Sequence, residues 1–399
     1  MERRATSHTL ASSNAEATAS ICQFTACGSP QWQVVEPARR PQGSARDIGK
    51  GAAWRVIGGG KGDGVSIEVC TMLDPMRDGK AALQALIERG LAESVTVGDV
   101  AQLTGGASSA TYRVEIEDGS GPRLLIFQRT AGDMNDSAPR SVQADVQARA
   151  GALGVPVARV IAKTLPSDDL GDGVVTELVE GEGLAPRWLR GEGYTAARAA
   201  LTGQCAEALA RLHSAPVSHW ADLPLKGGSG AELLADMFGW YRRLGVDVPA
   251  FDLAFAWLKP RMPQTPASCL VHGDFRSGNI LVGPEGLTAV LDWELTHLSV
   301  PAEDLAWLCV QAWRFGQWQL PVGGFGTRAA LLEAYGGGVT AGELHIWEVY
   351  GNLKWGMSCL QLADDHVSGR VPSVERAAIG RRVSEVAADL TYLLTFGEL

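Results

Sequence analysis

The chain has 399 residues, of which 46% are hydrophobic and 20% are charged, so it can form two or three compact units and is not disordered throughout. Its 35 basic and 45 acidic side chains give a net charge of −10, which argues against a nucleic-acid partner. An uninterrupted apolar run of about 18 residues is missing, so a membrane partner is not expected either.

The seven cysteines are far apart, with no CxxC pair and no Cys/His cluster at zinc spacing. Neither a disulfide framework nor a structural zinc site is therefore predicted. Widely spaced cysteines of this kind are typical of a reducing compartment, and the prediction is a cytoplasmic protein.

The first 71 residues are rich in Ala, Ser, Gly and Arg and show no sustained hydrophobic period. Glycines at 58–64 surround Lys61, but a glycine follows this lysine where a phosphate-binding loop has Ser or Thr. Residues 1–71 are predicted to be a disordered arm, or an extension upstream of a start at Met72 or Met76.

A regular spacing of hydrophobic residues begins at residue 78. An amphipathic helix is predicted from there to Gly90, where the pattern stops. Strands are predicted at 97–103, 112–117, 123–129, 157–163 and 174–179, with one helix at 139–153. These elements predict a small lobe at 78–181 that contains an antiparallel sheet.

After Gly181 the pattern is mainly helical. Helices are predicted at 195–214, 229–243, 248–259, 302–314, 328–336, 341–363 and 373–396. A hairpin of 280–282 and 288–291 interrupts them. The predicted fold class is therefore α+β, with the small sheet lobe followed by a large helical lobe at 182–399.

Three polar side chains stand at the ends of apolar strands around this hairpin. Asp274 and Asn279 are five residues apart before it, and Asp292 follows it. Phosphoryl transfer needs a carboxylate that deprotonates the attacking hydroxyl and oxygen ligands that hold Mg²⁺ against the phosphates. The hairpin returns Asp292 beside Asn279, so both can reach one cation.

The segments HGDFRSGNILV and AVLDWELTHLSVPAEDLAW resemble the aminoglycoside phosphotransferase/choline kinase family, which is related to the protein kinases. The resemblance extends over about 95–395 and is strongest to the subgroup like the kinase-like domain fused to some acyl-CoA dehydrogenases. It implies a bilobal protein-kinase-like fold, ATP or GTP as the phosphate donor, and Mg²⁺ as the cofactor.

The resemblance also implies roles for single residues. Asp274 would be the catalytic base, and Asn279 and Asp292 would be the Mg²⁺ ligands. Asp304 would be a buried acid that supports the catalytic loop through backbone N–H groups.

Other residues of the motif have two possible roles or a structural one. His272 is expected to pack and to hydrogen-bond the loop. Arg276 suits a phosphate or an anionic substrate, or it supports Asp274. Glu294 is either a carboxylate near the metal or a salt-bridge partner, and Trp293 is expected in the core.

On the nucleotide side, a short glycine-containing turn lies where the family has the loop over the phosphates. Its candidate residues are Gly105, Gly106, Ser108 and Ser109. The backbone from Glu177 to Val179 matches the hinge that meets the adenine edge.

The strand that should offer a cation to the phosphates has Gln128 at that position and Arg129 beside it. Successive side chains of a strand point to opposite faces of the sheet, so the register of this strand determines which of the two residues faces the phosphates. Arg129 is expected to matter more, because a neutral amide does not offset phosphate charge. For the helix acid that pairs with this cation, Asp145 is the nearest candidate and Gln143 the aligned residue.

The predicted function is a Mg²⁺- and ATP-dependent kinase that phosphorylates a hydroxyl of a small organic molecule, such as a hydroxyacyl-CoA or another alcohol. Two alternatives remain: an aminoglycoside or amino-alcohol (choline-like) kinase, and a nucleotide-binding pseudokinase. The substrate region is predicted among the aromatic residues after 302, although Trp347, Tyr350 and Trp355 have ordinary helical-core spacing.

Overall fold

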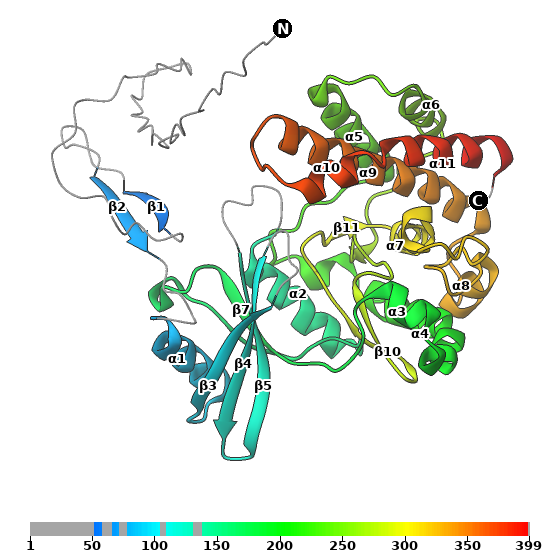
Figure 1. Cartoon of the computed structure of the whole chain (residues 1–399). Coiled ribbons are helices and arrows are strands. Elements are labelled where there is room, and N and C mark those ends of the chain that lie inside the picture. Colours follow the sequence, from blue (N-terminus) through cyan, green and yellow to red (C-terminus); the bar gives the residue numbers. More distant parts are fainter. Residues whose placement is uncertain (1–51, 58–65, 72–77, 104–108, 131–137, 398–399) are drawn as a thin grey trace, which may run out of the picture. The chain divides into compact units, whose positions relative to one another are not determined.

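The structure, a computed structural model, describes residues 52–57, 66–71, 78–103, 109–130 and 138–397 (Figure 1). Within the predicted arm, β1 (Ala52–Ile57) and β2 (Ser66–Thr71) form a two-stranded sheet. Whether residues 1–71 are a disordered arm or an extension upstream of the true start stays a prediction. The glycine cluster at 58–64 lies outside the described residues.

The small lobe is built on a five-stranded antiparallel sheet with the strand order β3-β4-β5-β7-β6. Its strands are β3 (Thr96–Leu103), β4 (Ser109–Asp118), β5 (Gly121–Thr130), β6 (Val160–Lys163) and β7 (Gly173–Glu177). The β4–β5 turn is closed by Asp118, whose carboxylate accepts a hydrogen bond from the Ser120 N–H at 2.8 Å.

One face of this sheet packs on α1 (Lys80–Leu91). Alternate residues of β4 and β5, among them Val114, Leu125 and Phe127, are fully or almost fully buried against the helix. On the helix, Leu83, Leu86 and Ile87 have the i, i+3, i+4 spacing that puts them on one side, and all three are buried. This apolar cluster forms the core of the small lobe.

The second helix of the small lobe, α2 (Arg140–Ala152), packs against β6 and β7. Figure 1 shows α1 and α2 on different sides of the sheet. Val146 and Ala150 of α2 belong to the apolar cluster of the large lobe, and among the described residues no α2 side chain joins the α1 cluster. The helix therefore connects the sheet to the large lobe.

The large lobe consists mainly of helices around one apolar core. They are α3 (Ala185–Arg190), α4 (Thr195–His213), α5 (Gly230–Leu244), α6 (Pro249–Leu258), α7 (Pro301–Cys309), α8 (Arg328–Tyr335), α9 (Ala341–Val367), α10 (Val374–Gly380) and α11 (Val383–Phe396). Two short antiparallel pairs complete it: β8 (Cys269–Val271) with β11 (His297–Ser299), and β9 (Ile280–Gly283) with β10 (Gly286–Val290). The predicted α+β bilobal fold is confirmed.

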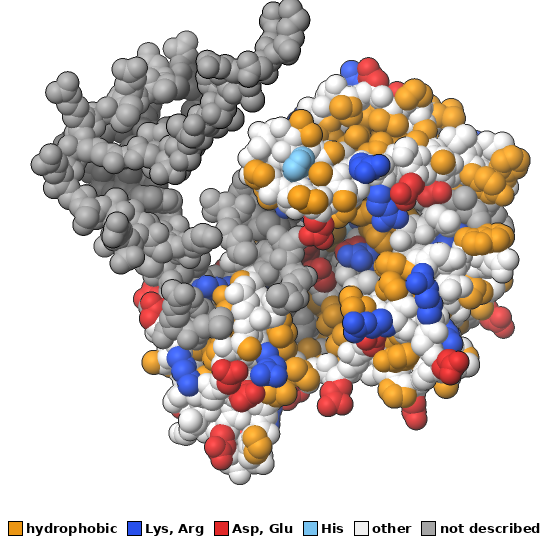
Figure 2. Space-filling model, in the orientation of Figure 1, with side chains coloured by type: hydrophobic (Ala, Val, Ile, Leu, Met, Phe, Trp, Pro, Cys, Tyr) orange, Lys and Arg blue, Asp and Glu red, His pale blue; other side chains and the backbone are white. Residues whose placement is uncertain are grey.

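The described surface carries charges of both signs. In the face shown in Figure 2, Lys and Arg side chains alternate with Asp and Glu over the part that the structure describes. Within the same part, no helix is both long and apolar enough to cross a membrane.

Candidate active site

The HGDF motif forms a loop between β8 and β9 that packs closely on the segment after Asp292. Gly273 has φ +78°, and a Cβ at this residue would lie 2.2 Å from the carbonyl oxygen of Leu295. Only glycine fits this approach, which explains the glycine between His272 and Asp274.

The Asp274 carboxylate is buried and held by three donors. Arg276 Nε donates to both oxygens, at 3.0 and 3.2 Å, and Asn279 Nδ2 donates at 2.5 Å. The third donor, Trp307 Nε1 of α7, lies 2.8 Å from Oδ1. Each oxygen thus accepts two of these four hydrogen bonds, so the protein fixes the whole carboxylate in position.

Arg276 is therefore a neighbour of the candidate base. Its guanidinium also lies over the Trp313 ring, 4.8 Å from the centroid. Of the two roles considered from the sequence, this geometry corresponds to support of Asp274.

His272 is completely buried, and burial lowers its pKa. The Asp274 N–H donates to His272 Nδ1 at 3.2 Å, so the neutral ring donates from Nε2 to the Leu291 carbonyl at 3.0 Å. Trp293, expected in the core, is 2% exposed and packs on this ring. These contacts tie the HGDF loop to the strand that leads to Asp292.

Asp304, near the start of α7, reaches the backbone of the same loop. One oxygen accepts a hydrogen bond from the His272 N–H at 2.7 Å and the other from the Gly273 N–H at 2.9 Å. His213 Nε2 of α4 lies 3.1 Å from the carboxylate. The acid therefore fixes the loop that carries Asp274.

Asp292 lies across the hairpin from Asn279, because the Leu291 N–H donates to the Asn279 carbonyl at 2.8 Å. Its backbone has φ +63°, a conformation that is uncommon for a residue other than glycine and is tolerated by Asp. Burial first, and then the carboxylates of Glu294 and Asp274, raise the pKa of Asp292 to about 6.

This crowding of negative charge fits a divalent cation, since Asp292 and Asn279 offer the oxygen ligands that Mg²⁺ prefers. Within the described residues, no three His, Cys, Asp or Glu side chains form a complete metal cluster. That is compatible with Mg²⁺, which usually takes its remaining ligands from water and substrate phosphates.

The expected cation position on β5 is occupied by Gln128, which pairs with Val174 of β7. The side chain of Arg129 projects from the opposite face of the sheet, the same face as Phe127. Its Nη2 donates to Tyr112 Oη at 3.2 Å. Arg129 thus lies on the α1 face of the sheet, and its phosphate-binding role stays a prediction that this geometry does not favour.

The two candidates for the helix acid have other partners in the structure. Asp145 pairs with Lys163 of β6 at 2.5 Å and not with a β5 cation. Gln143, the aligned residue, is buried and accepts a hydrogen bond from Arg140 Nη1 at 2.9 Å. Both members of the expected ion pair are thus neutral amides here.

At the predicted hinge, the Glu177 carboxylate pairs with Arg159 and Arg123, and the hydrogen bond from Arg159 contributes most to lowering its pKa. The Leu178 N–H donates to the Leu124 carbonyl at 3.3 Å. Among the described residues, the Val179 N–H has no hydrogen-bond partner and can meet a nucleotide base. The loop residues Gly105, Gly106 and Ser108 lie outside the described residues, and of Ser109 only the backbone at the start of β4 is described.

Two contacts of the site were not predicted from the sequence. Trp307 is one of the aromatic residues expected around the substrate, but its hydrogen bond to Asp274 was not foreseen. It lies three residues after Asp304, on the same side of α7, and that spacing was an available signal. Lys354 of α9 donates to the Gly273 carbonyl at 3.0 Å and pairs with Glu303 at 3.2 Å. No sequence signal connects a residue so distant to the loop.

The aromatic residues expected around the substrate separate into two groups. Trp307, which contacts Asp274, packs on Trp313, and Trp313 packs on Trp355, with ring centroids 5.3 and 4.8 Å apart in the two pairs. Trp347 and Tyr350 lie in the core, as their spacing indicates.

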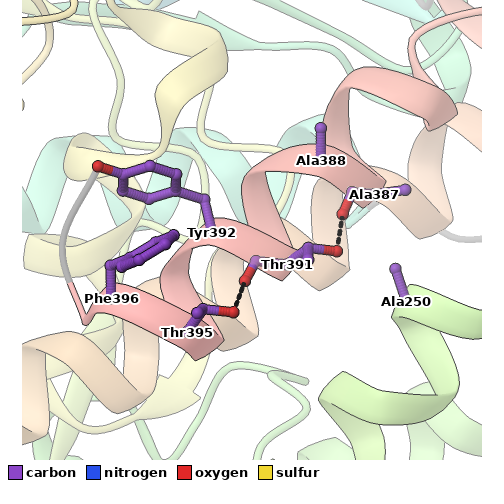
Figure 3. Close-up of a pocket in the computed structure, with 7 residues that line it drawn as sticks. All are labelled: Ala250, Ala387, Ala388, Thr391, Tyr392, Thr395 and Phe396. Carbon is purple, nitrogen blue, oxygen red and sulfur yellow. Dashed lines mark hydrogen bonds between the residues drawn. The ribbon is translucent and has the colours of Figure 1, made fainter.

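A separate hollow of about 460 Å³ lies between α6 and α11 (Figure 3). It is lined by alanine and threonine side chains and by the adjacent rings of Tyr392 and Phe396. None of the candidate catalytic residues lines this hollow, so it is distinct from the site.

Comparison with known proteins agrees with this geometry. Residues 99–342, more than half of the chain, match the phosphotransferase enzyme family (APH). The chain belongs to this family, and the predicted class of enzyme, a phosphotransferase, is confirmed.

Two curated relatives are mouse proteins. Acyl-CoA dehydrogenase family member 10 is 27% identical over 259 residues, which is 59% of this chain and 23% of the relative. Acyl-CoA dehydrogenase family member 11 is 33% identical over 167 residues, which is 39% of this chain and 21% of the relative. The chain thus spans less than a quarter of the length of either relative.

Solved structures share the fold. A putative aminoglycoside phosphotransferase from Ralstonia eutropha JMP134 has a TM-score of 0.57 at 21% identity, over 77% of this chain and 95% of that one. Spectinomycin phosphotransferase, solved with ADP and spectinomycin, has a TM-score of 0.53 at 15% identity, over 77% of this chain and 97% of that one.

Proposed function

We propose that this chain transfers the γ-phosphate of ATP or GTP to a hydroxyl group of a small organic molecule, with Mg²⁺ as the cofactor. The observation that carries the proposal is the Asp274 carboxylate, held by three donors and close enough to Asp292 to raise its pKa. A positioned base beside a crowded acidic pair is what phosphoryl transfer requires.

In this proposal Asp274 orients the acceptor hydroxyl and takes its proton, while Arg276 and Trp307 hold the carboxylate in place. Asp292 and the Asn279 amide oxygen would hold Mg²⁺, which when bound would offset the charge of the phosphates. The Val179 N–H would meet the base of the nucleotide. Asp304 and His272 keep the loop in the required conformation.

The acceptor is proposed to be an organic alcohol or a hydroxyacyl thioester such as a hydroxyacyl-CoA. All three tryptophans beside Asp274 already have a protein cation over the ring: Arg276 over Trp313 at 4.8 Å, Lys354 over Trp307 at 4.9 Å and Arg382 over Trp355 at 5.6 Å. Because protein cations already lie over these rings, the rings are not available in the same way to the ammonium groups of an aminoglycoside, and their apolar surface suits a carbon chain.

Release of ADP should be measured with hydroxyacyl-CoA thioesters, simple alcohols, choline, kanamycin and spectinomycin, with and without Mg²⁺. Turnover should need Mg²⁺ and occur with alcohols or thioesters, and Asp292→Ala should abolish it. An antibiotic kcat/KM above about 10⁴ M⁻¹s⁻¹, an ordinary value for a true substrate, would contradict the acceptor class. Tight nucleotide binding without turnover of any acceptor would instead indicate a pseudokinase.

A cytoplasmic location is also proposed. The four cysteines whose side chains the structure describes, Cys205, Cys269, Cys309 and Cys359, are free and buried, and burial raises the pKa of each thiol. Free thiols persist in a reducing compartment. Fractionation of cells that express the full chain would test this.

A further inference from the structure

Arg140, the first residue of α2, is a buried cation that the mechanism above does not use. It is 6% exposed, and its Nη1 donates to Gln143 at 2.9 Å. No carboxylate lies within salt-bridge distance of its side chain among the residues that the structure describes. A buried guanidinium without a carboxylate partner is costly, so an anionic ligand would stabilise it.

The start of α2 is fixed in position beside the acidic pair. The Arg140 N–H donates to Asp172 Oδ2 at 2.7 Å, and the Ala138 N–H donates to the Glu294 carbonyl at 3.3 Å. The second bond connects the small lobe to the segment that carries Asp292. Hydrogen bonds on both sides thus hold the first turn of α2 against this segment.

Arg140 lies close to the segment that carries Asp292. It follows Ala138 by two residues, and the Ala138 N–H is bonded to the carbonyl of Glu294, two residues after Asp292. Arg276 of the catalytic loop is already bound to Asp274, so the buried Arg140 offers a second positive charge beside this segment.

We propose that Arg140 is the phosphate-binding cation of this enzyme, supplied by the first turn of α2 in place of a cation on β5. The inference rests on the proposed function. It explains how a nucleotide can bind although Gln128 occupies the expected cation position and Gln143 the position of its acidic partner. The planar guanidinium can hold two phosphate oxygens at once, and the N-terminal end of a helix favours the same charge.

The test is binding of ATP, ADP, AMP and adenosine to the full-length protein in the presence of Mg²⁺, measured by titration calorimetry. Arg140→Met removes the charge and keeps an unbranched side chain, and Arg140→Lys keeps the charge without the fork. Arg149→Met is the matched control, because Arg149 lies on the same helix, is partly exposed and pairs with Asp222.

Arg140→Met should weaken ATP binding at least tenfold, weaken ADP binding less, and leave adenosine binding unchanged. Arg140→Lys should fall between Arg140→Met and the wild type, and Arg149→Met should bind like the wild type. Equal losses for ATP and adenosine would show a structural role and overturn the inference, as would wild-type ATP affinity in Arg140→Met.

The two proposals fail in different ways. A wild-type protein that binds ATP and transfers its phosphate, together with an unaffected Arg140→Met, overturns the role of Arg140 alone. A wild-type protein that binds no nucleotide overturns both. If Arg140→Met does not fold, the ratio of ATP affinity to adenosine affinity is compared between Arg140→Lys and the wild type. A lower ratio in Arg140→Lys supports the inference. An unchanged ratio contradicts it, because a structural role would not change that ratio.

Discussion

At the scale of single residues, the candidate base is held by side chains from two elements. Arg276 and Asn279 belong to the loop that carries Asp274, whereas Trp307 belongs to α7. Donors fixed before the substrate arrives need no reorganisation during the reaction, which is how preorganised sites lower a barrier. The arrangement therefore predicts a large and specific effect of removing the charge of Asp274.

Asp274→Asn should lower kcat by about 10²–10⁴-fold, the usual contribution of a general base, with little change in KM for ATP. The new amide would place an N–H against one of the three donors, so a loss of about 1–3 kcal/mol of stability is also expected. Steady-state kinetics and thermal unfolding measure the two effects separately. Turnover equal to the wild type would exclude Asp274 as the base.

Asp304 gives a prediction on pH. Burial favours its neutral form, but the hydrogen bond from His213 and those from the loop backbone outweigh this and hold its pKa below the usual value. A lowered pKa stabilises the folded state in full above the unfolded value of about 4. This contribution decreases as the pH falls below that value and is lost only as the pH passes the lower pKa of the folded state. Asp304→Asn should therefore cost about 3–5 kcal/mol at pH 7 and about 1 kcal/mol less at pH 3.

Denaturant unfolding at both pH values measures this difference. Asp247→Asn is the control. Asp247 is exposed and pairs with the exposed Arg242 at the long distance of 3.9 Å, and such a surface pair contributes about 0–1 kcal/mol to stability. A loss of stability in Asp304→Asn that is the same at pH 7 and pH 3 would contradict the ionised role of Asp304.

Much of the candidate site could be predicted from spacing, because Asp274, Asn279 and Asp292 are close in sequence and joined by one hairpin. The roles of Arg276 and Arg129 could not. Each depends on which neighbour the guanidinium meets, and a shift of one residue on β5 exchanges the two faces of the sheet. The sequence did not indicate a role for Arg140, because neither the burial of this residue nor its proximity to the segment that carries Asp292 is a local property of the sequence.

At the scale of elements, two helical glycines have opposite surroundings. A Cβ at Gly356 of α9 would lie 2.3 Å from the buried ring of Phe251 on α6, whereas Gly203 of α4 is exposed with nothing within 4 Å of that position. Gly356 therefore permits close packing of two helices, and Gly203 only lowers helix propensity.

Gly356→Ala should destabilise the protein by about 1–3 kcal/mol through overpacking, and Gly203→Ala should stabilise it by about 0.5–1 kcal/mol. Thermal and denaturant unfolding of the two variants measure these changes, and each serves as the control for the other. If both substitutions shifted stability in the same direction, helix propensity and not packing would govern these positions.

Long helices could be predicted from their apolar period, whereas short elements could not. The three-residue strands β8 and β11 contain too few residues for an alternating pattern, and they form because the loop and Asp304 bring them together. The predicted helix at 373–396 is divided into α10 and α11. A Cβ at Gly380, where α10 ends, would lie 2.6 Å from that of Ala363, so the close approach to α9 and the break coincide there.

At the scale of the whole molecule, two apolar clusters support the two lobes, and α2 joins them. The small-lobe cluster extends from Leu83 to Val175, and the large-lobe cluster begins with Val146 and Ala150 of α2 and ends at Leu393. The helix that presents Arg140 thus belongs to the core of the lobe that presents Asp292. A displacement of α2 would separate the proposed phosphate-binding cation from the proposed metal ligands.

The same distribution leads to a prediction for residues 1–71. Every member of the two clusters and every described residue of the candidate site lies after residue 78. A chain that starts at Met72 should therefore fold, bind ATP and turn over acceptor with wild-type kcat/KM, because its core and its catalytic residues are intact. Its melting temperature should change by less than about 2 °C, which corresponds to less than about 1 kcal/mol for a chain of this size. Calorimetry and the ADP-release assay check both points. A fall of many degrees would show that the strands β1 and β2 contribute to the folded core, and lost turnover without a fall in melting temperature would show that the segment serves the acceptor site.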